Sequence, residues 1–141
     1  MRGVELSDVV LLGGKPSMYH GVLNAPGMRE ALAEKVLVSI LGGVTVEALR
    51  QSLYGASTSH STETQKQSHI VRCIPNTAAA VRQSMTIVYD SKQPVPSSIM
   101  ERVESTFLRV GRVKQMPVSL ASVAGSLAGS TAAFFSWSSR A

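Results

Sequence analysis

Three short turns, each directly after an apolar run, contain the residues whose types could most clearly contact a ligand. They are Gly13-Gly14-Lys15-Pro16, Gly42-Gly43 and Pro75-Asn76-Thr77. Glycine lets a ligand approach the backbone closely, lysine offers a point charge, and an asparagine amide both donates and accepts hydrogen bonds. The set fits a flat polar ligand that carries phosphate. Taken singly, a glycine pair is also ordinary turn chemistry and Asn76 an ordinary helix cap, so the fold must bring the turns together.

Apolar runs beside these turns predict the strands that would position them. The runs are short, continuous and partly β-branched, as is typical of strands covered on both faces. Pro75 ends one of them because proline cannot donate a hydrogen bond to the sheet. The predicted strands are residues 9–12, 36–41, 70–74 and 85–89.

Helices are predicted between the first three strands. Asn24 can cap a helix with Pro26 in its first turn and apolar residues at helical spacing over 28–34. Thr45 can cap a second helix over 46–53. The polar stretch 55–67 has no periodicity and is typical of a surface loop.

Two further helices are predicted after residue 74. A short one is expected through Ala78 to Arg82. A longer one is expected after the capping-box pattern of Ser98 to Glu101, with apolar residues spaced by four along one face and Gly111 closing it.

Alternation of strands and helices predicts an α/β fold with a parallel sheet and helices on its faces. Ligands of such sheets bind outside the carboxyl ends of the strands. All three turns follow strands, so we expect them at that edge.

Composition and charge exclude several classes of function. The net charge is +5, but basic residues are scattered and only 5% of residues are aromatic, which disfavours nucleic-acid binding. Cys73 is the single cysteine, so no internal disulfide forms, and we expect a buried thiol in a reducing compartment. His20, His60 and His69 lack metal-ligand spacing, and no metal is expected. The first residues do not resemble a signal peptide, so a cytoplasmic protein is predicted.

Five strings of the sequence resemble one family, the pyrroline-5-carboxylate reductases, and in particular their fungal branch. They occur in the family's order over nearly the whole chain. The strings are DVVLLGGKP (8–16), LVSILGGVT (37–45), IVRCIPNTAAAVRQSMT (70–86), FLRVGRV (107–113) and LAGSTAAFF (127–135).

The resemblance implies reduction of 1-pyrroline-5-carboxylate, a small cyclic imino acid, to L-proline in proline biosynthesis, with NADPH or NADH as the coenzyme. It implies no catalytic acid or base, because the step depends on stacking the nicotinamide against the substrate ring. By resemblance, six residues contact the coenzyme and three hold the substrate carboxylate. The coenzyme contacts are Gly14, Lys15, Pro16, Gly42, Gly43 and Asn76, and the carboxylate contacts are Gly129, Ser130 and Thr131.

The sequence also departs from the family pattern. It contains no GxGxxG, the turn that places pyrophosphate on a helix N-terminus. We therefore expect residues 1–116 to form a partial, Rossmann-like coenzyme domain with weak dinucleotide binding, and 117–141 to begin the helical dimerisation domain. Ala132 replaces the family's proline, and no acidic residue follows Glu104.

Residues 117–137 carry no charge and include the spacing Gly125-x-x-x-Gly129, which a membrane anchor could also show. Small residues and serines throughout favour close helix packing, so we expect no membrane contact and a homo-oligomer, or pairing with a full-length homologue. Two alternative functions stay open. One is reduction of a related cyclic imino acid, such as piperideine or methylpyrroline carboxylate, in secondary metabolism. The other is a truncated, non-catalytic partner of a full-length reductase.

Overall fold

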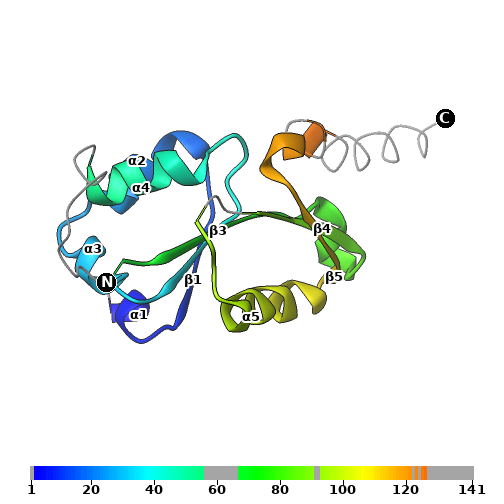
Figure 1. The fold of residues 1–141 in the computed structure, drawn as a ribbon, viewed down its shortest axis with the longest axis horizontal. Helices are drawn as coiled ribbons and strands as arrows, with labels where there is room; N and C mark the ends of the chain where they lie inside the picture. The colour runs from blue at the N-terminus through cyan, green and yellow to red at the C-terminus, as the bar shows by residue number, and fades with distance from the viewer. Residues whose placement is uncertain (1, 56–66, 91–92, 122, 124, 127–141) are drawn as a thin grey trace. The chain divides into compact units, whose positions relative to one another are not determined.

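The computed structural model describes residues 2–55, 67–90, 93–121, 123 and 125–126. Five strands form one sheet in sequence order (Figure 1). Strands β1 and β2, β2 and β3, and β4 and β5 pair in parallel. The sheet with its flanking helices confirms the predicted α/β fold. The strands are β1 (Val9–Leu12), β2 (Val36–Ser39), β3 (His69–Ile74), β4 (Ser84–Tyr89) and β5 (Gly111–Met116).

The chain divides into two compact units, Met1–Arg72 and Cys73–Ala141, and each is described by itself. Helices α2 and α4 lie side by side in the first unit (Figure 1). The helices of this unit are α1 (Arg2–Glu5), the 3₁₀ helix η1 (Pro16–Met18), α2 (Tyr19–Leu23), α3 (Met28–Ala31) and α4 (Val46–Tyr54). Its core is a cluster of buried aliphatic side chains: Leu12, Leu23, Leu32, Leu37, Leu41, Val44, Leu49, Leu53 and Ile70.

One helix cap in the first unit is confirmed and one is wrong. The Thr45 hydroxyl accepts a hydrogen bond from the Ala48 N–H at 3.1 Å, which fixes the start of α4. Asn24, predicted to start a helix, ends α2 instead. The next helix starts after Gly27, whose φ of +79° is left-handed, and α3 is one turn long, shorter than predicted.

Lys35 ties the first helix to the sheet. Its ammonium donates hydrogen bonds to the carbonyl oxygens of Val4, Glu5 and Ser7 at 2.8, 2.6 and 2.7 Å. Val4 and Glu5 are the last two residues of α1, and Ser7 follows shortly after the helix ends. A half-buried cation therefore holds the N-terminal segment beside β2.

The second unit packs α5 (Ser97–Leu108) against β5, with η2 (Thr77–Val81) before β4 and η3 (Val118–Leu120) after β5 (Figure 1). Val103 and Phe107 are the buried residues of α5, one turn apart as predicted. Ile87 and Tyr89 form a second buried cluster, against which the partly buried Ile74, Met116 and Ala121 pack.

Three predictions for this unit need correction. β5 was not expected, because its sequence GRVKQM is polar and largely exposed. Gly111 opens this strand and does not close α5. The capping box at Ser98–Glu101 does not form, because Pro96 occupies the N-cap position and α5 begins at Ser97.

The short helix predicted after Asn76 has nearly the bounds expected for it. The short helix expected at 78–82 is the 3₁₀ helix η2, which ends before Arg82, a residue in the left-handed conformation with φ 58°. The predicted small-residue helix lies largely outside the described residues, and the domain boundary at residues 116 and 117 stays a prediction.

Candidate functional site

The first two predicted turns lie at the same edge of the sheet. β1 and β2 are parallel, with Leu12 opposite Ser39, and the Ile40 N–H donates to the Leu12 carbonyl at 3.0 Å. The chain therefore leaves both strands at the same level. Gly14 follows the carboxyl end of β1 and Gly42 that of β2, which is the edge where ligands of parallel sheets bind.

Glycine is required where these turns bend. Gly14 has φ +122° and Gly43 has φ +74°, conformations that side-chain-bearing residues rarely adopt. Among the described residues, a Cβ added to Gly14, Gly42 or Gly43 would meet no atom within 4 Å apart from those of the adjoining residues in the chain. The space above these glycines is thus open to a ligand, and packing against protein does not explain them.

Gly13 has a different role from its neighbour. A Cβ added there would lie 3.3 Å from Cδ1 of Ile40. This glycine therefore packs under a side chain of the adjacent strand end, and it brings the two turns close together. Gly14 alone of this pair faces open space.

Lys15 and Pro16 continue the first turn. Lys15 is the N-cap residue of η1 and Pro16 opens that helix, where its missing N–H costs nothing. Both residues are exposed. Among the described residues the Lys15 ammonium has no hydrogen-bond or ion-pair partner, so its charge is available to an anionic ligand.

Asn76 lies in the second unit and is described within it. It occupies the N-cap position of η2, yet its side chain makes no capping hydrogen bond. Its backbone N–H donates to the Ser84 hydroxyl at 3.2 Å. The ordinary-cap interpretation of this residue is therefore wrong.

The Asn76 side-chain oxygen is buried and has no hydrogen-bond partner among the described residues. A buried acceptor without a donor costs about 1–3 kcal/mol, so native structures nearly always satisfy it. A hydroxyl of a bound ligand would supply such a donor. This atom is the strongest sign in the second unit that a polar ligand belongs here.

The structure does not test the predicted substrate residues. Gly129, Ser130 and Thr131 lie outside the described residues. Within the described part of the chain, no group of three His, Cys, Asp or Glu side chains could hold a metal ion. No described helix is both long enough and apolar enough to cross a membrane.

Burial raises the pKa of the Cys73 thiol to about 12. The thiol is fully buried, and a thiolate would lose its hydration there. Cys73 is therefore a small core residue, as predicted, and not a nucleophile.

Curated relatives of this chain are named pyrroline-5-carboxylate reductases. A pyrroline-5-carboxylate reductase of Lophium arboricola is 40% identical over 129 residues, which are 92% of this chain and 40% of that protein. One of Neurospora crassa is 35% identical over 142 residues, 92% of this chain and 41% of the relative. The chain resembles the pyrroline-5-carboxylate reductases. It spans about two fifths of the length of these relatives.

Solved structures agree with the sequence relatives. The pyrroline-5-carboxylate reductase of Coxiella burnetii superposes with a TM-score of 0.77 at 26% identity, covering 95% of this chain and 46% of that one. A Plasmodium falciparum pyrroline carboxylate reductase, solved with NADP bound, gives 0.78 at 24% identity with the same two coverages and shows likeness of fold. No protein-family model matches the chain. The resemblance predicted from the sequence is confirmed.

Proposed function

We propose that the chain is the nicotinamide-side part of a reductase that converts 1-pyrroline-5-carboxylate to L-proline. One observation carries the proposal: the register of β1 and β2 sets two open glycine turns at one sheet edge. The relatives named for this reaction support the choice of substrate. We take NADPH as the coenzyme because a reductase of the same fold was solved with NADP.

Each candidate residue then has a defined task. When bound, the reduced nicotinamide supplies a hydride to the carbon of the protonated C=N bond. Gly14, Gly42 and Gly43 let the coenzyme approach the backbone, and Lys15 offers a positive charge to its phosphate. The orphaned Asn76 oxygen accepts a hydrogen bond from a ribose hydroxyl.

Positioning accounts for the chemistry that these residues contribute. Holding two rings in near-contact converts a bimolecular encounter into an effectively unimolecular step, which needs no strong acid or base. We propose that Gly129, Ser130 and Thr131 bind the substrate carboxylate through backbone N–H groups, as the resemblance implies.

Oxidation of NADPH by the purified chain tests this function. Absorbance at 340 nm is followed with 1-pyrroline-5-carboxylate at high protein concentration, since binding without a GxGxxG turn should be weak. Substrate-dependent oxidation is the expected result. No oxidation above the protein-free rate, or oxidation only with the six-membered imine, would contradict the proposal.

Substitution of Asn76 sharpens the test. Asn76→Ala removes a buried oxygen that has no partner, so it should leave stability unchanged or slightly higher. The same change should weaken NADPH binding about tenfold, because the ribose loses its acceptor. Asn24→Ala is the matched control, since Asn24 is an exposed residue at the end of α2.

A further inference from the structure

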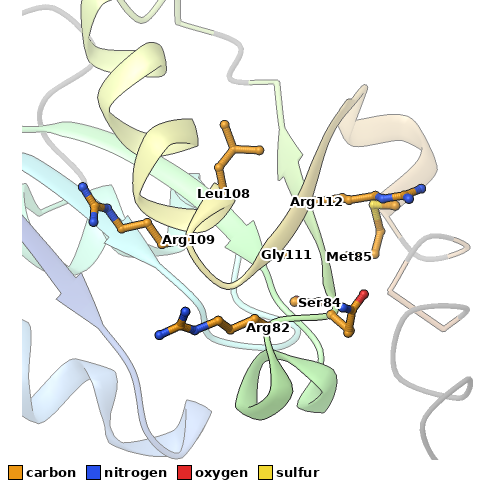
Figure 2. Close-up of a pocket in the computed structure, with 8 residues that line it drawn as sticks. Arg82, Ser84, Met85, Leu108, Arg109, Gly111 and Arg112 are labelled. Carbon is orange, nitrogen blue, oxygen red and sulfur yellow. The ribbon is translucent and has the colours of Figure 1, made fainter.

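A pocket lies within the second unit, at the start of β4 and β5 and the end of α5. Its volume is about 540 Å³, which is within the range of small-molecule sites. Figure 2 shows the labelled lining residues, and the lining as a whole comes from the stretches 82–85, 108–109 and 111–112. The lining comprises Arg82, Gln83, Ser84, Met85, Leu108, Arg109, Gly111 and Arg112.

The charge of this lining is one-sided. Arg82, Arg109 and Arg112 contribute three positive charges, and no acidic residue lines the pocket. The described acidic residues of this unit, Asp90, Glu101 and Glu104, all lie elsewhere. Like charges around one pocket raise its energy, and an anion inside relieves that repulsion.

The three guanidinium groups are available for binding. Among the described residues none of them has a hydrogen-bond or ion-pair partner. Arg82 is also held in the left-handed conformation at φ 58°, which disfavours any residue with a side chain over glycine. Arg82 lines the pocket from the end of η2.

We propose that this pocket binds a small anion with two linked charged groups, such as a diphosphate or a dicarboxylate. Figure 2 shows Arg82 and Arg109 extending to one side of the pocket and Arg112 to the other, beside Met85. Guanidinium groups bind phosphate and carboxylate through paired hydrogen bonds. Arg112 is exposed and lines the same pocket, so its side chain must turn toward the pocket for one linked anion to meet Arg82 and Arg109 with one charged group and Arg112 with the other.

Two features favour a small anion over a nucleic acid. Among the described residues no aromatic side chain lines the pocket, so the described lining offers no surface on which bases could stack. The volume of about 540 Å³ also suits a small molecule. The proposal does not depend on the reductase function.

Calorimetric titration of the full chain with inorganic pyrophosphate tests the site. One saturable site is expected, and Arg82→Gln, Arg109→Gln and Arg112→Gln should each weaken binding at least tenfold. Arg102→Gln is the matched control: it removes the same charge from α5 at an exposed position outside the pocket, and should change affinity less than twofold. Equal loss in Arg102→Gln and Arg109→Gln, or no saturable binding, would overturn the proposal.

Further titrations identify the class of ligand and distinguish this site from the coenzyme site. Pyrophosphate should bind at least tenfold more tightly than orthophosphate, and equal affinities would refute the requirement for two charged groups. Saturable succinate binding with the same pattern of variants would support a dicarboxylate. Asn76→Ala should leave pyrophosphate affinity unchanged, so failure of one proposal is distinguishable from failure of the other.

Discussion

Replacing Gly111 by alanine should destabilise the second unit by about 2–4 kcal/mol. Gly111 opens β5 with φ +152° and pairs with Ser84 of β4. An added Cβ would lie 2.7 Å from the Ser84 carbonyl carbon and closer still to its backbone N and O. These are backbone atoms of a paired strand, so no side chain can move aside.

Two costs make up this magnitude. A left-handed backbone costs a residue with a Cβ about 1–3 kcal/mol. Relieving the clash also separates the strands where the Ser84 N–H donates to the Val110 carbonyl at 3.0 Å, and a lost hydrogen bond costs about 0.5–1.5 kcal/mol.

Urea unfolding followed by far-ultraviolet circular dichroism measures the effect. The midpoint should fall by at least about 0.7 M, given m-values of about 1–3 kcal/mol per M. Gly21→Ala is the matched control: Gly21 is inside α2, and in the described part of the chain no atom outside its own helix lies within 4 Å of its added Cβ. The control should stabilise by about 0.5–1 kcal/mol. Equal midpoints for Gly111→Ala and Gly21→Ala would refute the steric reasoning.

Two further predictions concern buried groups. Lys35→Met removes three charge-assisted hydrogen bonds of a half-buried ammonium and should cost about 2 kcal/mol in urea unfolding, with faster amide exchange in residues 2–8; an equal loss in the exposed Lys114→Met would contradict this. The pKa of the Cys73 thiol rises from 9.0 to about 12 on burial, so its thiolate fraction near pH 8 is about a thousandfold lower in the folded than in the unfolded chain. Iodoacetamide should therefore modify Cys73 only in denaturant, and because the unfolded thiol ionises first, Cys73 contributes stability below pH 9 that is lost as the pH rises toward 12; rapid native alkylation would refute the burial argument.

Strands that are buried on both faces could be predicted from the sequence. The largely apolar sequence of β2 marks such a strand, and β2 is buried at every position. β1 is just as apolar, but Leu11 is 55% exposed, so the prediction that β1 is covered on both faces is wrong. β5 could not be predicted in this way, since its exposed residues include Arg112 and Lys114. The alternation around Val113 is its only local signal, and its pairing with β4 is a tertiary effect.

Helix caps show the same difference between features set by neighbouring residues and features set by the rest of the structure. Thr45 was predictable because its hydroxyl bonds the N–H three residues later, a contact within one turn. Ser98 has the right pattern, but Pro96 fixes the helix start earlier. The sequence located the strand-end turns of the candidate site, whereas the orphaned oxygen of Asn76 and the arginine pocket depend on packing that local patterns do not contain.

Mapping NADPH on the ¹⁵N-labelled chain tests the central claim most directly. The account predicts that the amide signals of Gly14, Lys15, Gly43 and Asn76 shift together and saturably as NADPH is added. Shifts confined to Gly111 and the arginine pocket, with the glycine turns unmoved, would contradict it.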